Sequence, residues 1–180
     1  LGGDETLGTL AGAGAVALQS FTLGTGLGGD SSFGGVISGS GNLVKLGGSR
    51  LTLAGANTYT GSTRVEAGTL ALAGADRLAD TSRLQVQTGG SVTLAGDDTV
   101  ASADIAGTLG GSGRLSAATY TLAGGTVLAD LGTGTLSSTG SSTLGGSANA
   151  GTVNVQGGSL ALGAAHRLSD SAAVSVAADA

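Results

Sequence analysis

The stretch Leu51-Thr-Leu53-Ala-Gly55 contains the unit from which the fold is built, because apolar and polar residues alternate and a glycine follows. Such alternation with a turn residue behind it predicts a short β-strand with one buried face. The phrase returns at Leu70-Ala-Leu72-Ala-Gly74, Val92-Thr-Leu94-Ala-Gly96, Tyr120-Thr-Leu122-Ala-Gly124 and Leu160-Ala-Leu162-Gly163. The steps between the central leucines are 19, 22, 28 and 40 positions, and we interpret the last step as two turns of one coil. This spacing predicts an all-β solenoid of roughly 20–22 residues per turn.

A second alternating strand lies between the copies and supports the same coil. Its members are Thr63-Arg-Val65, Leu84-Gln-Val86, Val153-Asn-Val155 and Val174-Ser-Val176. Residues 61–86 also match residues 151–176 at an offset of 90, with apolar residues facing apolar ones. Because four turns of about 22 residues give that offset, we expect the two segments to lie four turns apart on one face.

Stacking explains why such a sequence coils into one segment over residues 1–180. A three-residue strand cannot bury its apolar side alone, but each leucine can pack on the leucine of the turn below, about 4.8 Å away. Backbone N–H and C=O groups then pair with the turns above and below. About eight turns and a rod on the order of 40 Å long are expected.

Composition agrees with a thin layered core. Hydrophobic residues make up 40% and charged residues 11% of the chain, which is the opposite of a disordered balance. Pro and Cys are absent, and Phe and Tyr occur twice each, so neither disulfides nor a wide aromatic core are expected. A net charge of −5 disfavours nucleic acid as a partner. The longest apolar run, Ala11 to Leu18, is too short for a membrane span, and without a basic leader before an apolar stretch we expect an internal fragment.

One stretch, residues 39–72, resembles a known family. It reads Leu43-Val-Lys45, then Leu51-Thr-Leu53-Ala-Gly55, then Asn57-Thr-Tyr59-Thr-Gly61, then Thr63-Arg-Val65-Glu-Ala-Gly68-Thr-Leu70. This order is similar to the autotransporter-associated β-strand repeat, also called the passenger-associated transport repeat. It departs from that pattern at Ser49-Arg50, where the family prefers Gly and a small residue.

The resemblance implies a right-handed, single-stranded parallel β-helix within the secreted passenger of a bacterial autotransporter. It implies export through the outer membrane by a C-terminal β-barrel translocator and a place at the cell surface or in the medium. Passengers of this kind serve as adhesins, aggregation factors or stalks. The chain is therefore expected to be a structural or adhesive part of a longer passenger, with a host-surface ligand or another copy as possible partner of its extended face. Open solenoid ends predict concentration-dependent association of the isolated chain.

Two glycine-rich matches and one histidine are candidate sites. Gly24-Thr-Gly26-Leu-Gly-Gly29 fits G-x-G-x-x-G, but no helical pattern follows, as a dinucleotide site requires. The segment from Gly26 to Asp30 is one partial copy of a calcium-binding repeat that needs many copies. His166 lacks a nucleophile and an orienting acid in a recognisable motif, and Asp76 takes its place in the matching repeat, so an exposed loop is favoured.

Charged residues provide the alternative function, a glycosidase or lyase on the same fold. Asp97, Asp98 and Asp104 could form a carboxylate cluster for it if they shared one concave face. Adjacent residues in a strand point to opposite faces, which disfavours that arrangement. The recurring pairs Arg77/Asp80 and Arg167/Asp170 predict local ion pairs or turn-capping contacts.

The remaining polar and aromatic candidates are assigned structural roles. Asn57 is expected to stack against Asn or Thr of adjacent turns as a ladder, and Tyr59 to lie in the turn behind it. Tyr120 is the other tyrosine. We therefore predict no catalytic, cofactor-binding or metal-binding residue, no cofactor, and no enzymatic activity for this segment.

Overall fold

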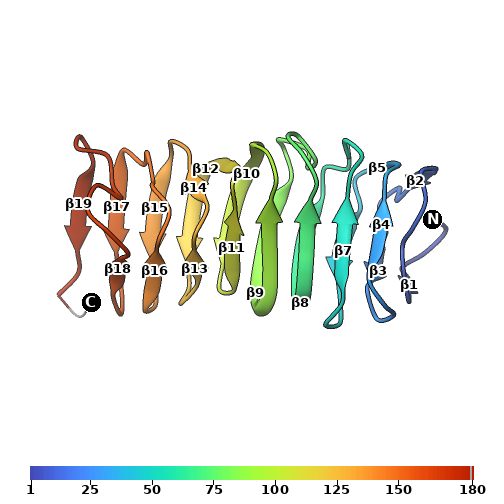
Figure 1. The fold of residues 1–180 in the computed structure, drawn as a ribbon, viewed down its shortest axis with the longest axis horizontal. Coiled ribbons are helices and arrows are strands. Elements are labelled where there is room, and N and C mark those ends of the chain that lie inside the picture. Colours follow the sequence, from blue (N-terminus) through green and yellow to red (C-terminus); the bar gives the residue numbers. More distant parts are fainter. Residues whose placement is uncertain (179) are drawn as a thin grey trace.

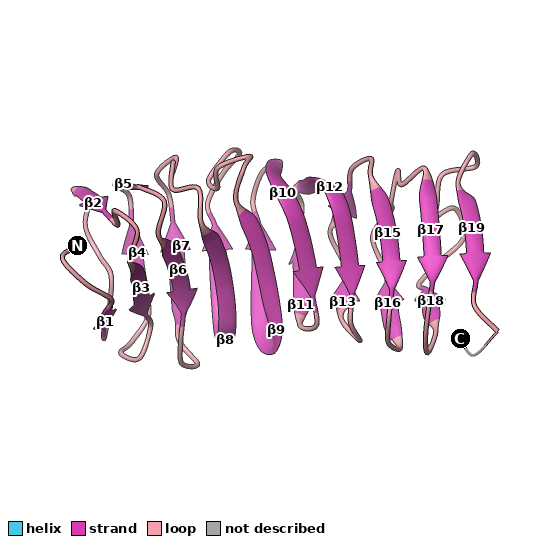
Figure 2. Ribbon diagram, turned by 180° about the vertical axis from the view of Figure 1, so that it is seen from behind, coloured by secondary structure: helices cyan, strands magenta, loops and turns pink. Residues whose placement is uncertain are grey.

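Residues 1–178 and residue 180 are described by a computed structural model, which shows a rod of stacked strands with the termini at opposite ends (Figure 1). No helix occurs among these residues, and the paired strands run parallel (Figure 2). The predicted all-β parallel β-helix is confirmed, with about nine turns instead of eight. Within the described part, no helix is long and apolar enough to cross a membrane.

The strands fall into three faces that each turn visits in order. The first face contains β1 (Glu5–Leu7), β3 (Thr22–Thr25), β6 (Asn42–Lys45), the first halves of β8 (Ser62–Leu72) and β9 (Arg83–Leu94), the second halves of β10 (Asp98–Ile105) and β12 (Arg114–Leu122), β15 (Thr135–Ser138), β17 (Thr152–Val155) and β19 (Ala173–Val176). The second face contains β4 (Ser31–Phe33), β7 (Arg50–Leu53), the second halves of β8 and β9, β11 (Thr108–Gly111), β13 (Thr126–Val127), β16 (Ser142–Leu144) and β18 (Leu160–Leu162). The third face contains β2 (Ala15–Ala17), β5 (Val36–Ser38), the first halves of β10 and β12, and β14 (Asp130–Leu131).

Turn length changes along the rod. From Leu23 to Leu84 the residues that pair on the first face are 20 or 21 positions apart, and we call these the wide turns. From Ala103 to Val153 they are 16 or 17 positions apart, and we call these the narrow turns. The turn length predicted from the sequence therefore describes the first part of the rod. The second part coils more tightly because its corners are shorter.

This change moves one copy of the repeated phrase to another face. Leu94 pairs with Gly111 on the second face, and Leu162 pairs with Leu144 there. Leu122, which the spacing placed in the same series, pairs with Ile105 and Ser138 on the first face. That assignment was wrong because the phrase encodes a strand and a turn without specifying which face the strand joins.

The echo between residues 61–86 and 151–176 also spans more turns than expected. Val65 connects to Val155 on the first face through five successive pairings, by way of β9, β10, β12 and β15. The two segments therefore lie five turns apart, not four, because the intervening turns are shorter than the sequence spacing suggested. On the second face Leu70 connects through the intervening strands to Leu162 and not to Leu160, so the echo is out of register there.

Alternate side chains point inward and form one continuous core. Leu43, Leu84 and Leu136 of the first face and Leu51 and Leu70 of the second are fully buried. Burying such a side chain stabilises the fold by roughly 1.5–3 kcal/mol. The outward positions left over form the surface on which any partner must bind.

Candidate functional site

Outward side chains form regular rows on the first face. One row contains Thr22, Asn42, Ser62, Arg83, Ser102, Thr119, Thr135 and Thr152. A second contains Val44, Arg64, Gln85, Asp104, Thr121, Ser137 and Asn154. Successive members are separated by the strand spacing of about 4.8 Å. The face is thus an extended, shallow surface dominated by hydroxyl and amide groups.

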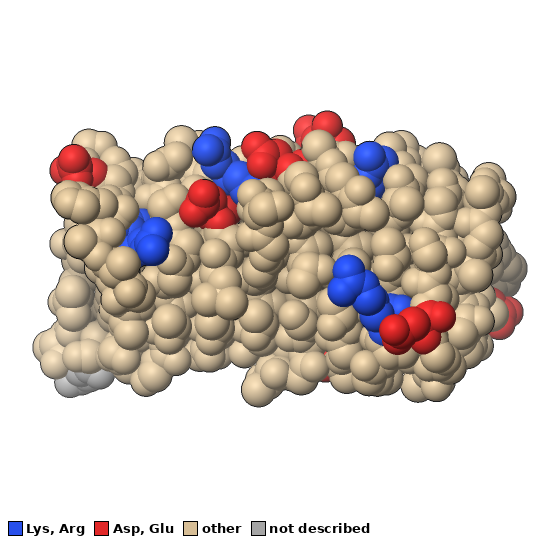
Figure 3. All heavy atoms as spheres, in the orientation of Figure 1, with Lys and Arg blue, Asp and Glu red and all other residues tan. Residues whose placement is uncertain are grey.

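The second face carries a comparable row of hydroxyl groups. This row begins at Arg50, and its further members, which pair from turn to turn, are Thr69, Ser91, Thr108, Thr126 and Thr143. On the side of the rod that Figure 3 shows, charged side chains are few and scattered across a largely uncharged surface. Such a surface offers many weak polar contacts and no single charged focus.

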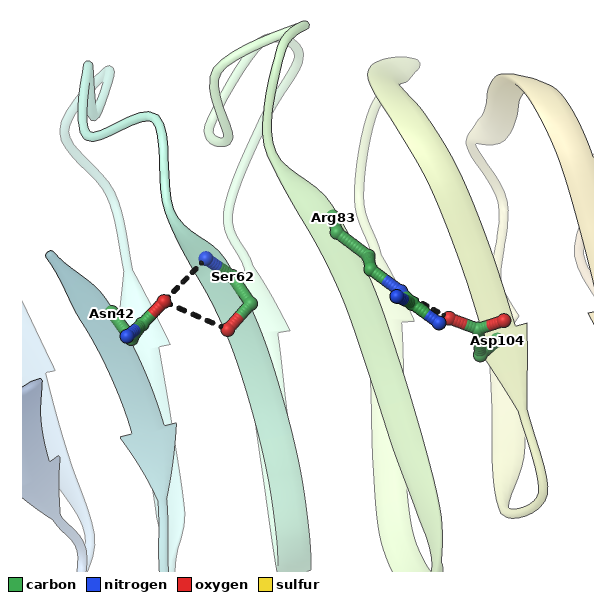
Figure 4. Close-up of polar contacts among 4 residues, drawn as sticks. All are labelled: Asn42, Ser62, Arg83 and Asp104. Carbon is green, nitrogen blue, oxygen red and sulfur yellow. Dashed lines mark hydrogen bonds and ion pairs between the residues drawn. The ribbon is translucent and has the colours of Figure 1, made fainter. Parts of the chain in front are cut away.

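Two contacts within the first-face rows connect neighbouring turns (Figure 4). The Asn42 Oδ1 atom accepts hydrogen bonds from the N–H and the Oγ–H of Ser62, both at 2.9 Å. The Arg83 Nε atom donates to Asp104 Oδ2 at 2.6 Å, and this hydrogen bond and charge raise the pKa of Arg83. Because Arg83 is exposed, solvent screens the pair, and it contributes little stability.

Aspartates at the corners hold backbone N–H groups of the following turn. The pairs, each joined to an Oδ1 atom at 2.7–2.8 Å, are Asp4 with Thr22, Asp30 with Arg50, Asp97 with Arg114 and Asp130 with Ser147. The N–H and the hydroxyl of Ser147 also lower the pKa of the Asp130 carboxyl. These carboxylates fasten successive turns at places where strand pairing begins.

The three carboxylates considered for hydrolysis have separate positions. Asp97 is exposed at a corner and accepts from the Arg114 N–H. Asp98 is 1% exposed and accepts from the N–H groups of Arg77 and Leu78. Asp104 lies on the first face with Arg83. The arrangement that acid–base hydrolysis requires, two carboxyls across one cleft, is not formed by these residues.

A hollow on the surface lies close to these residues but contains none of them. Its lining comes from three successive turns and consists of Thr99, Val100, Ser116, Ala117, Ala118, Thr133 and Gly134. This lining has neither a carboxylate for acid–base work nor an aromatic ring for sugar stacking. Within the described residues, no group of three or more His, Cys, Asp or Glu side chains converges on a possible metal position.

The predicted ion pairs Arg77/Asp80 and Arg167/Asp170 are not among the contacts of these described side chains. His166 Nδ1 instead lies 4.0 Å from Asp170 Oδ1, and both side chains are almost fully exposed. His166 and Asp76 share left-handed backbone conformations, with φ of 56° and 55°. Asp and His adopt this conformation more readily than most residues, which explains why they replace each other in the matching turns.

The glycine-rich segment at residues 24–29 has a packing role. Gly24 belongs to β3, and β4 follows at Ser31, so the segment connects two strands and no helix follows it. A Cβ atom on Gly26 would lie 2.6 Å from the Leu46 carbonyl oxygen and 2.8 Å from the Lys45 Nζ atom. Its φ of 103° independently favours glycine.

Lys45 is a buried cation whose interior position was not predicted from the sequence. Its Nζ atom donates to the carbonyl oxygens of Leu46, Gly47 and Ala67 at 2.5, 2.9 and 3.2 Å. Burial lowers the pKa of Lys45, and Asp30 partly offsets this effect. Three carbonyl oxygens at one corner are thus satisfied by one side chain, and the only signal was the lysine of the repeat pattern.

The predicted Asn57 ladder is wrong, because this side chain bonds to backbone. Its Oδ1 atom accepts from the Ile37 N–H at 2.9 Å, and its Nδ2 atom donates to the carbonyls of Gly55 and Arg77. Asn57 therefore connects three turns by itself. Tyr59 follows it, but its ring is fully buried and its hydroxyl bonds to Thr63 Oγ1. Burial is also the main cause that raises the pKa of Tyr59.

Comparison with known proteins assigns one stretch of the chain to a known family of repeats. Residues 43–72 match the family model of the passenger-associated transport repeat. This stretch is an autotransporter passenger repeat, and here it forms consecutive turns of a β-solenoid. The resemblance seen in the sequence is thereby confirmed.

Two proteins similar in sequence to part of this chain come from Neisseria meningitidis serogroup B, strains MC58 and H44/76. Each is a Neisserial autotransporter lipoprotein NalP, 46% identical to this chain over 65 residues. The match covers 36% of this chain and 6% of the relative, so the chain corresponds to a small part of those proteins. No solved structure gives a significant match.

Proposed function

We propose that this chain is a structural and adhesive segment of an autotransporter passenger, displayed as a rod at the bacterial surface or released. The observation that carries the proposal is the passenger repeat at residues 43–72 within an uninterrupted solenoid. A rod of this kind holds whatever precedes it away from the membrane and stacks each new turn on the last. Its partner during export is a C-terminal β-barrel translocator in the parent protein.

Deletions that preserve or destroy the register test the rod. The full chain is placed between a signal peptide and a translocator barrel, with an epitope tag at its N-terminus. Deleting residues 104–120 joins Ala103 to Thr121 and removes one whole turn. Because Ala103 pairs with Tyr120, Ala103 then takes the place of Tyr120 and the register of the remaining turns is kept. We expect surface display, measured by antibody binding to intact cells, to persist. Deleting residues 104–111 removes about half a turn and is expected to abolish protease-resistant display; equal display of both variants contradicts the proposal.

A third deletion tests the secretion role of the repeat itself. Removing residues 43–62 takes out one whole turn between Asn42 and Thr63, since Leu43 pairs with Thr63. Like the 104–120 deletion, it preserves the register, but it removes two thirds of the passenger repeat. Slower appearance of the tag at the surface than in the 104–120 deletion supports a secretion role, and equal rates of appearance argue against it.

The adhesive part of the proposal rests on the hydroxyl rows of the first face. Replacing Thr119, Thr135 and Thr152 by lysine places three like charges along one row without altering an inward residue. Settling of cells that display the chain is expected to become slower, while display stays constant. The matched control carries the same three changes on the second face, at Thr108, Thr126 and Thr143. Unchanged settling in both variants removes adhesion and leaves a stalk.

We also propose that the segment has no catalytic activity of its own. The separate positions of Asp97, Asp98 and Asp104 support this. The purified chain is incubated with anionic and neutral polysaccharides, and the reducing ends released are measured. The amount should not exceed that released by the double variant Asp97→Asn, Asp104→Asn. Release that the double variant lacks would restore the glycosidase or lyase alternative.

A further inference from the structure

Asp98 occupies an unusual position for a carboxylate, because its side chain lies inside the rod and connects two turns. It begins β10 on the third face, and 1% of its surface is exposed. Its Oδ2 atom accepts two hydrogen bonds, from the Arg77 N–H at 2.8 Å and the Leu78 N–H at 3.2 Å. Its Oδ1 atom is buried without a hydrogen-bond partner among the described residues. The two oxygens therefore have different roles.

The backbone of Arg77 is held from both sides, by the side chain of Asn57 in the preceding turn and by that of Asp98 in the following turn. The carbonyl of Arg77 accepts from Asn57 Nδ2 at 2.8 Å on one side, and its N–H donates to Asp98 on the other. Asn57 makes its contacts with a neutral amide, whereas Asp98 makes its contacts with an acid. A buried charge costs far more than a buried hydroxyl group, even when neither is fully bonded.

Charged and titratable groups around the carboxyl do not compensate its charge. They are Asp76 and Arg77 from the turn below, Asp97 beside it, Arg114 from the turn above and Tyr59 from the core. Asp76 acts against ionisation of Asp98, and the Nε atom of Arg77 is itself buried without a partner in the described part of the chain. Burial raises the pKa of Asp98 to about 6, although the backbone N–H groups of Arg77, Leu78 and Thr99 act in the opposite direction.

We propose that Asp98 is a proton-operated clamp that fastens the turn of Arg77 and Leu78 more tightly in mildly acidic medium than at neutral pH. The proton binds at Oδ1, which accepts no well-formed hydrogen bond among the described residues, and Oδ2 keeps both N–H groups, although they bind a neutral acid more weakly than a carboxylate. The cost of the buried charge disappears, and this gain is larger than the weakening of the two hydrogen bonds. The clamp goes beyond the proposed passenger role, and it gives a secreted rod a central segment that resists mild acid.

The direction of the effect follows from linkage. In the folded chain the carboxyl has a higher pKa than in the unfolded chain, so the folded state binds more protons between these two values. Stability is therefore greatest below the unfolded pKa of 3.8 and falls as pH rises through about 6. This direction is opposite to that of ordinary acid denaturation.

Hydrogen exchange at the amides of Arg77 and Leu78 in the full chain tests the clamp. After correction for intrinsic exchange, the opening constant is expected to be about tenfold smaller at pH 5.0 than at pH 7.5. The variant Asp98→Asn should show no such change, and the neighbouring Asp97→Asn should behave like the wild type. The exposed His166 lies several turns away, and subtracting the Asp98→Asn profile removes its contribution.

Two results would overturn the clamp: an opening constant that does not fall at pH 5.0 in the wild type, or an equal fall in Asp98→Asn. If Asp98→Asn does not fold, carbon-13 titration of the Asp98 carboxyl in the wild type decides the matter. A midpoint above pH 5 supports the clamp, and a midpoint below pH 5 rejects it.

Discussion

The wide turns between β3 and β9 and the narrow turns between β10 and β17 solve the same stacking problem with different side chains. The wide turns enclose leucines together with Lys45, Asn57 and Tyr59. The narrow turns enclose several alanines, which are Ala103, Ala117, Ala129, Ala148 and Ala150. The narrow turns also bury leucines and Tyr120, but alanine occupies several of their inward positions, as a shorter perimeter with a smaller cross-section favours. Turn length and the number of inward alanines therefore change together in this rod.

The largest expected effect tests how much the wide turns depend on large inward residues. Leu51→Ala removes a fully buried side chain that pairs with Leu70 of the next turn. We expect a loss of about 2–5 kcal/mol in the free energy of unfolding, because the neighbouring turns cannot collapse around the cavity. Urea denaturation followed by circular dichroism measures it. The outward neighbour Thr52→Ala is the control, expected within about 0.5 kcal/mol; equal losses would mean that the leucine column does not support the wide turns.

The opposite change tests the narrow turns. Ala103→Leu adds volume at an inward position that is 1% exposed and pairs with Leu84 and Tyr120 of the neighbouring turns. Because Ala103 is enclosed by these side chains and does not line the surface hollow, overpacking should cost about 1–3 kcal/mol. Ala101→Leu adds the same atoms at a nearby exposed position and should leave the urea midpoint nearly unchanged. If Ala103→Leu is tolerated equally well, the narrow turns have spare volume and do not require small inward residues.

The two tyrosines extend this contrast because one lies in each region. The Tyr120 hydroxyl accepts from the Ala117 N–H at 2.8 Å and donates to the Leu115 carbonyl at 3.0 Å. The Tyr59 hydroxyl contacts the side chain of Thr63. Tyr120→Phe leaves a buried backbone N–H without a partner and should cost about 1–3 kcal/mol. Tyr59→Phe should cost less stability, since the hydroxyl of Thr63 can rotate. Thermal unfolding of both variants measures the order. A lower unfolding temperature for Tyr59→Phe than for Tyr120→Phe would contradict it.

The strands and their inward leucines could be predicted from sequence, because alternation directly reports which side chains are buried. Turn length could not, since it is determined at corners where no periodic pattern exists. For this reason the spacing assigns Leu122 to the wrong face and places the echo four turns apart instead of five. The interior positions of Lys45 and Asp98 also escaped prediction, because charged residues are almost always exposed and their burial here depends on backbone groups of other turns.

The outward rows were less predictable than the core for a related reason. Thr69, Ser91, Thr108, Thr126 and Thr143 form one row only because the pairing of the second face aligns them. In the sequence they are separated by unequal intervals, so no single period reveals the row. Predicting which outward residues share a surface row on a solenoid with variable turns therefore requires the strand register, whereas predicting its core residues does not.

One carboxylate of the narrow turns behaves oppositely to Asp98. Asp130 is exposed, and the N–H and hydroxyl of Ser147 bind its Oδ1 atom at 2.8 and 2.7 Å. They hold the pKa of Asp130 below its ordinary value of 3.8. Its contribution to stability is therefore present above that value and is lost as pH falls through the folded pKa.

The smallest expected effect comes from removing this charge. Asp130→Asn should lower the unfolding temperature slightly at pH 7 and leave it unchanged at any pH below the folded pKa of Asp130, where the wild-type carboxyl is also neutral. Thermal unfolding at several pH values measures this, with Asp80→Asn as the control, because Asp80 makes no such contact among the described residues. A destabilisation by Asp130→Asn that is as large at low pH as at pH 7 would show that the inter-turn contact does not need the charge. Asp130, whose contact is expected to weaken in acid, would then no longer contrast with Asp98, whose contact is expected to become stronger.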